Sequence, residues 1–227
     1  MQRFYYSRLE VFVSSVTGET IITAVSHGIL CHLATAIRRN GLDFKVIGIT
    51  GPARSGKDSA ARVLVNQHGF VRYGLADPIR KMLESIDVNF SDKDKETPLP
   101  KFDNRTPREL MQSLGTEWMR DSVDKDGWLK MAIQEYEWLK HDPSSFGMVI
   151  PDVRFSNEAD WVREHGVLIH ISRPQVNHKN KHESDKALLP KAGDFFICND
   201  HTAAFLGKQI NDYMNQRHEA PKSSVSR

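Results

Sequence analysis

The residues best suited to chemistry lie in the segment GPARSGKD, Gly51 to Asp58. Through Lys57 it follows the pattern G-x-x-x-x-G-K of a loop that binds phosphate groups. Its glycines let the backbone approach a phosphate, successive N–H groups wrap the oxygens, and the lysine adds a positive charge. Asp58 replaces the usual Ser or Thr that binds Mg²⁺. A carboxylate also binds hard cations, so we expect Asp58 to be the metal ligand, with the Ser59 hydroxyl or a purely electrostatic role for Asp58 as alternatives.

A second pair of polar residues, Asp152 and Arg154, follows the apolar run FGMVIP at residues 146–151. Open α/β sheets bind ligands at the carboxyl ends of their strands, and a guanidinium fork suits a phosphate. Asp152 could hold Arg154 or a metal-bound water. The alternative is an ordinary ion pair at the end of a strand.

Short apolar runs bounded by turn residues indicate the strands that position these residues. The expected strands are 45–50, 70–73, 146–151, 167–171 and 194–198. Helical patterns alternate with them, which predicts an α/β domain with a parallel sheet covered on both faces. The phosphate loop would then join a buried strand to a helix, the context that supports such a motif.

Helix starts are marked by capping residues. Thr106, Pro107 and Glu109 form a capping box, while Asp77 and Ser156 are expected N-caps of two further helices. After Thr106, the residues Leu110, Leu114 and Trp118 predict an apolar stripe, with Arg108, Gln112 and Gly115 on the opposite side. Other helices are expected near 60–67, 126–141 and 201–214, and residues 88–105 are expected to be an exposed loop.

Residues 1–44 contain the most apolar run, Ile21 to Ile37. It is too short and too polar for a membrane span, and its flanks do not fit a secretory signal. We expect a hydrophobic helix that rests on the domain or pairs with another chain, or a dispensable extension.

Composition limits the remaining possibilities. With 227 residues, 39% of them hydrophobic, the chain has room for one globular domain with a modest insertion. A net charge of +2 does not indicate nucleic-acid or membrane binding. Two cysteines cannot form a disulfide framework, which fits the cytoplasm.

Several segments together resemble the phage deoxynucleoside monophosphate kinases, relatives of the P-loop nucleoside monophosphate kinases. They are GPARSGKDSA, YGLADPIRKML, RELMQSLGTEW with DGWLK, VIPDVRFSNEA, VLIHISRP and ICND. The resemblance spans residues 45–216 and implies the three-layer P-loop NTPase fold with a five-stranded parallel sheet. It also implies a helical substrate-binding region at 88–142 and a lid at 173–192. The polar composition of residues 217–227 predicts a tail.

The resemblance implies transfer of the γ-phosphoryl group of ATP, with Mg²⁺, to a deoxynucleoside monophosphate. The catalytic candidates are Lys57, Arg54, Arg154 and Arg173, with Lys179 and Lys181 as further lid residues. The ATP-binding candidates are Gly51, Arg54, Ser55, Gly56, Lys57, Asp58, Ser59, Asn199 and Asp200. The acceptor-binding candidates are Arg80, Lys81, Arg108, Gln112, Gly115, Thr116, Trp128, Asp152 and Arg154.

Some of these residues have simpler interpretations. Trp128 could stack on a base or belong to the core, Gln112 could read a base or face solvent, and Asp200 could cap a helix instead of lying near the adenine. Two other functions remain open: a kinase similar to dephospho-coenzyme A kinase, with Asp77 or Asp152 as base, and a non-catalytic module that binds nucleotides or DNA. The expected partners are small nucleotides, with a homodimer left open.

Overall fold

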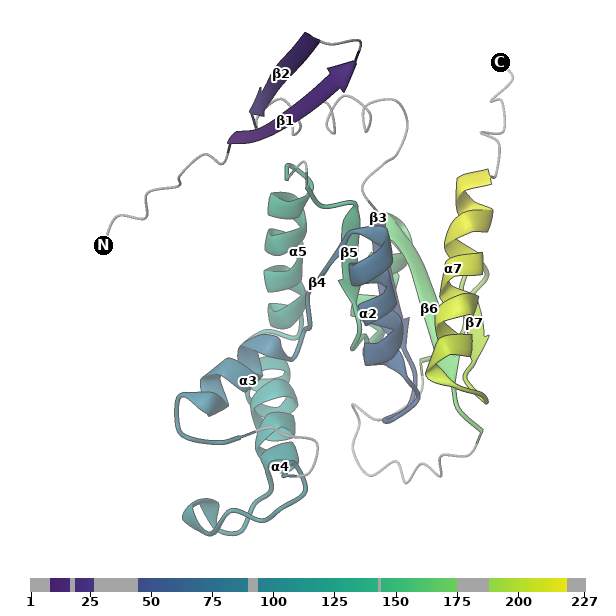
Figure 1. Cartoon of the computed structure of the whole chain (residues 1–227). Helices are drawn as coiled ribbons and strands as arrows, with labels where there is room; N and C mark the ends of the chain where they lie inside the picture. The colour runs from purple at the N-terminus through teal and green to yellow at the C-terminus, as the bar shows by residue number, and fades with distance from the viewer. Residues whose placement is uncertain are drawn as a thin grey trace, which may run out of the picture.

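The centre of the protein is a five-stranded sheet with the order β4-β5-β3-β6-β7, in which all neighbouring strands are parallel (Figure 1). The computed structural model describes residues 9–16, 19–26, 45–89, 94–142, 144–174 and 188–219. The strands are β3 (Lys45–Thr50), β4 (Phe70–Arg72), β5 (Gly147–Ile150), β6 (Gly166–Ser172) and β7 (Phe195–Cys198). All five agree with the predicted positions to within about two residues, so the α/β prediction is confirmed.

Helices cover both faces of this sheet. The helices are α2 (Lys57–His68), α3 (Asp77–Glu84), α4 (Pro107–Gln112), α5 (Gly127–Leu139), α6 (Ser156–His165) and α7 (Ala203–Glu219). One core joins α2 and α7 to the sheet, and the other joins α3, α5 and α6 to its opposite face. In Figure 1, α3 and α4 lie below α5, to the left of the sheet.

The alternation of side chains along β3 explains the two cores. Val46 belongs to the core under α3, α5 and α6, whereas Ile47 and Ile49 belong to the core under α2 and α7. Gly48 lies on the first of these faces, where a Cβ would stand only 2.7 Å from Val162 Cγ1. The central strand is therefore buried on both sides, as a strand in a covered parallel sheet must be.

The predicted helix starts are partly correct. Thr106 and Glu109 form the expected capping box: the Glu109 N–H donates to Thr106 Oγ1 and the Thr106 N–H donates to Glu109 Oε2. The other two N-caps were predicted one residue too late, because α3 begins at Asp77 and α6 begins at Ser156. The Asp77 carboxylate binds arginines and the Gly74 N–H instead of capping its helix.

The predicted apolar stripe is correct at Leu110 and Leu114, which are partly buried against the core, and wrong at Trp118. The cause is a π-helix, η2 (Ser113–Val123), which continues α4. Its wider hydrogen-bond step moves residues to faces that the α-helical period does not predict. Trp118 is 43% exposed instead of buried. Gly115, predicted on the polar side, is buried, and a Cβ there would lie 3.0 Å from Ile79 Cδ1.

The predicted exposed loop at residues 88–105 is confirmed over most of its described part, with Val88 as the buried exception. Val88 is 1% exposed, residues Pro100–Phe102 form a short 3₁₀ helix, and Leu99 makes an isolated bridge with Arg105. Residues 90–93 lie outside the described part of the chain.

Two antiparallel strands precede the domain, β1 (Leu9–Val16) and β2 (Glu19–Ser26). The helix predicted from Ile21 is therefore wrong over residues 21–26, where β-branched residues favour a strand. Its remainder, 27–37, lies outside the described residues, as do residues 175–187 of the expected lid. Helix α7 also runs to Glu219, beyond the predicted end at Met214. Within the described ranges, none of the helices has the length and apolar character needed to cross a membrane.

Two glycines provide a test of this packing. At Gly166, the first residue of β6, a Cβ would lie 1.8 Å from the carbonyl oxygen of Val46, which is backbone and cannot rotate away. We expect Gly166→Ala to lower the free energy of unfolding by about 1–3 kcal/mol. Gly207→Ala in α7 places its Cβ at an ordinary 3.6 Å from Val63 Cγ2 and should stabilise by up to about 1 kcal/mol. Urea denaturation of both variants measures the contrast, and equal effects would contradict it.

Candidate active site

The phosphate loop connects the carboxyl end of β3 to the N-terminus of α2, and its two glycines are required by its geometry. Gly51 has φ 143°, and a Cβ there would lie 2.1 Å from the carbonyl oxygen of Ile171. Gly56 has φ 107° and is the N-cap of α2. Both conformations favour glycine, and the first also lacks space for any side chain.

Lys57 spans this loop. Its Nζ donates to the carbonyl oxygens of Gly51 at 2.7 Å and Pro52 at 2.6 Å. No side chain caps the N-terminus of α2, so the N–H groups of its first turn are not satisfied by a cap. An ammonium group beside a helix N-terminus is a suitable place for phosphate oxygens.

Asn199 holds the phosphate loop through hydrogen bonds to the backbone. Its Nδ2 donates to the Ser55 carbonyl oxygen at 2.8 Å, and its backbone N–H donates to the Ser172 carbonyl oxygen at 2.8 Å. Asn199 is only 6% exposed and Ser55 is fully buried. The sequence interpretation placed Asn199 beside the adenine, whereas its side chain is bound to the backbone of the phosphate loop.

The remaining donor-side candidates are more open. Arg54 and Asp58 are exposed, and Arg54 has φ 62°, an uncommon conformation that recurs at ligand sites. Asp200 is exposed and lies 3.7 Å from His201. The alternative of an Asp200 helix cap is wrong, because Thr202 Oγ1 accepts the Phe205 N–H at the start of α7.

Asp152 and Arg154 follow β5 at the same edge of the sheet as the phosphate loop. The Asp152 carboxylate accepts the backbone N–H groups of Leu75 and Ala76, both at 2.9 Å. It thereby ties the end of β5 to the segment that leads into α3. The Arg154 side chain is exposed, and its backbone N–H donates to Glu158 Oε2 at 2.9 Å.

Arg80 belongs to a charge cluster centred on Asp77. Asp77 accepts hydrogen bonds from Arg72 Nη1 at 2.5 Å, Arg80 Nη1 at 3.0 Å and the Gly74 N–H at 3.0 Å. Burial alone would raise the pKa of Asp77, but these donors lower it below its usual value. Sequence analysis missed Arg72, although its position at the end of a predicted strand was a usable signal.

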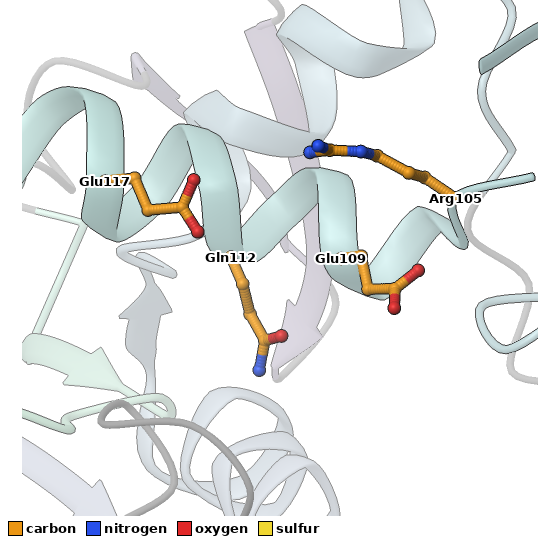
Figure 2. A pocket seen from close by; sticks show the side chains of 4 residues that line it. All are labelled: Arg105, Glu109, Gln112 and Glu117. Carbon is orange, nitrogen blue, oxygen red and sulfur yellow. The ribbon is translucent and has the colours of Figure 1, made fainter. Parts of the chain in front are cut away.

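The polar residues of the helical region lie near α4. Arg108 Nε pairs with Glu96 at 2.5 Å, and Lys81 is exposed on α3. Gln112 lines a hollow of about 290 Å³ with Arg105, Glu109 and Glu117 (Figure 2). Two carboxylates and one guanidinium make this hollow unsuitable for a phosphate, whereas an amide beside them can read the edge of a base.

Three acceptor candidates lie in the core. Thr116 and Trp128 are 6% and 5% exposed, and Gly115 is also buried. The Trp128 Nε1–H donates to the carbonyl oxygen of Gly115 at 2.9 Å. The core interpretation of Trp128 is therefore correct in this structure, and its role is to support η2. Arg173 is half-buried just after β6, next to residues outside the described part of the lid.

These features together define a class of protein. A parallel α/β sheet with a lysine-bearing phosphate loop after its central strand, and arginines beyond a neighbouring strand, is the arrangement of a P-loop phosphotransferase. The sequence profile of the family described as "Deoxynucleotide monophosphate kinase" matches residues 45–105 and 101–210. The chain belongs to the deoxynucleotide monophosphate kinase family and is a kinase.

Curated relatives support this membership. The chain is 32% identical over 181 residues to a putative deoxynucleotide monophosphate kinase of Acanthamoeba polyphaga mimivirus, covering 73% of this chain and 93% of that protein. It is 25% identical over 237 residues to the deoxynucleotide monophosphate kinase of Enterobacteria phage T4, covering 74% and 98% respectively. The family resemblance expected from the sequence is thus confirmed.

The Asp77 cluster predicts a pH dependence of stability. Because the folded-state pKa of Asp77 is lowered, its ionised form stabilises the protein above the unfolded pKa, and this contribution is lost as the pH falls through the folded value. We expect Asp77→Asn to cost about 0.5–1 kcal/mol at pH 7, since the cluster is partly exposed.

The measurement is urea denaturation at pH 7 and near pH 3. The difference between Asp77→Asn and the wild type should shrink at the lower pH, whereas the exposed control Asp121→Asn should have little effect at either pH. A difference that grew on acidification would contradict the assigned cluster.

Proposed function

We propose that the protein transfers the γ-phosphoryl group of ATP to the 5′-phosphate of a deoxynucleoside monophosphate, giving ADP and a deoxynucleoside diphosphate. The main support is the placement of the phosphate loop and of Arg154 at the same carboxyl edge of the sheet, after the neighbouring strands β3 and β5. The names of the curated relatives agree with this reaction.

The phosphate loop fits the donor nucleotide. The loop is free of side chains at Gly51 and Gly56, and the uncapped first turn of α2 offers backbone N–H groups. Lys57 would exchange its two carbonyl acceptors for phosphate oxygens, because a charged acceptor binds an ammonium more strongly than a neutral one.

Mg²⁺ would be held by Asp58, an exposed carboxylate in the first turn of α2. When bound, Mg²⁺ would neutralise phosphate charge and so assist transfer. Ser59 remains the alternative source of an oxygen ligand, since it is the next residue along the same turn.

Arginines would align the two substrates. Arg154 would bind the acceptor phosphate through its fork, with Arg80 and Lys81 from α3 adding positive charge. Arg54 and Arg173 would stabilise the transferring group, because phosphoryl transfer requires charge neutralisation and alignment more than covalent chemistry. On the helical side, Arg108 and Gln112 would contact the nucleotide, and Asp152 would hold the α3 segment in place.

The alternative kinase with a hydroxyl acceptor is less well supported. Such an acceptor needs a carboxylate base, and the two candidates are already engaged: Asp77 by arginines and Asp152 by two backbone N–H groups. A phosphate acceptor is already anionic at neutral pH and needs no such base. A screen of ADP release with each deoxynucleotide, each ribonucleotide and dephospho-coenzyme A tests the proposal. The proposal would be contradicted if dephospho-coenzyme A were the single acceptor that supported ADP release. It would also be contradicted if none of the acceptors did.

Lys57→Ala should remove most activity while the protein stays folded. Loss of an electrostatic contact that stabilises transition-state charge costs roughly 3 to 4 kcal/mol, which corresponds to a fall in kcat of about 10²- to 10³-fold. Single-turnover phosphoryl transfer, together with a thermal melt, measures both properties. A turnover within about threefold of the wild type would refute the phosphate-loop assignment.

Arg154→Lys should impair acceptor binding selectively. Lysine keeps the charge but loses the bidentate fork, so the acceptor KM should rise and kcat/KM should fall by at least about tenfold. ATP affinity, measured without acceptor, should barely change. If the variant lost ATP affinity and kept its acceptor KM, Arg154 would belong to the donor side.

A further inference from the structure

A buried carboxylate is hydrogen-bonded to the backbone of the segment that contains Arg154. Glu158, in the first turn of α6, is 4% exposed. A single oxygen, Oε2, accepts the backbone N–H groups of both Arg154, at 2.9 Å, and Phe155, at 3.0 Å. The backbone that carries the Arg154 side chain is therefore fixed by Glu158.

Arg120, near the end of η2, reaches the other oxygen of this carboxylate. Its Nη1 lies 3.6 Å from Glu158 Oε1, and its guanidinium carbon lies 3.5 Å from the centre of the Phe155 ring. Its Nη2 also donates to Asn157 Oδ1 at 3.2 Å. The side chain is 13% exposed, and its guanidinium contacts three residues of the loop and helix that follow β5, namely Phe155, Asn157 and Glu158.

A further hydrogen bond extends the connection. Asn157 Nδ2 donates to Asp126 Oδ1 at 2.8 Å, and Asp126 immediately precedes α5. The end of η2 and the beginning of α5 are thus both bound to the start of α6. These contacts link the helical region to the residues after β5 through charged and polar groups.

We propose that Arg120 and Glu158 are positioning residues that couple the helical region to Arg154, so that the acceptor phosphate and the rest of the nucleotide are bound as one unit. This inference rests on the proposed function, because it assigns Arg154 to the acceptor. Neither side chain needs to touch the nucleotide. Glu158 orients the Arg154 backbone, and Arg120 ties that carboxylate to η2.

The ionisation of Glu158 adds a second observable. Burial raises its pKa to about 7, although the N–H groups of Arg154 and Phe155 and the charge of Arg120 oppose the rise, and Asp152 adds to it. Protonation removes the attraction to Arg120. The coupling should therefore weaken as the pH falls below about 7, and it should be complete only above that value.

Glu158→Gln tests the ion pair with little other change. The amide oxygen can still accept both backbone N–H groups, while the amide N–H₂ faces the Arg120 guanidinium, a donor opposite a donor. Arg120→Met removes the other partner, and Arg120→Lys keeps the charge without the planar contact on Phe155. We expect the first two variants to weaken acceptor binding about tenfold and the lysine variant to recover part of that loss. Binding of ATP alone should be unchanged.

The experiment is calorimetric titration of the full chain with each deoxynucleoside monophosphate, without ATP, from pH 6 to pH 8.5. The ratio of the Kd values of Glu158→Gln and the wild type should approach one at the acidic end. Asp194→Asn is the matched control, because it alters another buried carboxylate paired with an arginine, Arg163. It should lower thermal stability without changing acceptor Kd.

The outcomes separate the two proposals. A wild-type protein that phosphorylates none of the deoxynucleotides fails the proposed function. An active wild type whose Glu158→Gln and Arg120→Met variants bind acceptor with unchanged Kd at all pH values fails the coupling. Loss of acceptor affinity to the same extent in Asp194→Asn would also overturn it, because the effect would then be one of general stability.

Discussion

The close approach of the phosphate loop to β6 constrains the rest of the site. A side chain at residue 51 would collide with the carbonyl oxygen of Ile171. The backbone that follows β3 therefore lies in close contact with the neighbouring strand β6. Strand β6 ends at Ser172, whose carbonyl oxygen accepts the Asn199 backbone N–H. The side-chain amide of Asn199 donates to the Ser55 carbonyl oxygen in the phosphate loop. The loop is thus held from two sides, which keeps the N-terminus of α2 fixed before any ligand binds.

Three arginines on the proposed acceptor side are already paired within the protein. Arg72 and Arg80 share Asp77, and Arg108 pairs with Glu96. These pairs are partly exposed and therefore weak, so an incoming phosphate can replace a carboxylate at little cost. The pair of Arg120 and Glu158 differs because it is buried, and breaking a buried pair leaves an uncompensated charge. Exchangeable pairs suit ligand binding, and the buried pair suits positioning.

Local sequence signals predicted the sheet, most of the helices and the phosphate loop, because each depends on residues close in the chain. The capping box at Thr106 and the glycine-lysine pattern of the phosphate loop are such signals. Long-range pairings were not predictable. The contact of Asn199 with Ser55 and that of Arg120 with Glu158 join residues far apart in sequence, and no spacing rule encodes them. Residues 21–26 were misassigned since an apolar run fits a helix or a strand equally well.

The π-helix was also beyond prediction, and it explains why Arg120 was missed. A helical period of 3.6 residues assigns Gly115 and Trp118 to the wrong faces, because the hydrogen-bond step changes after Ser113. The Trp128 indole bonds the Gly115 carbonyl oxygen, and Gly115 itself packs closely on Ile79, so the core specifies the altered backbone from both sides. Arg120 lies further along the same π-helix. Its direction toward Glu158 therefore depends on the π geometry, so the buried Trp128 supports the proposed acceptor side although its ring lies in the core.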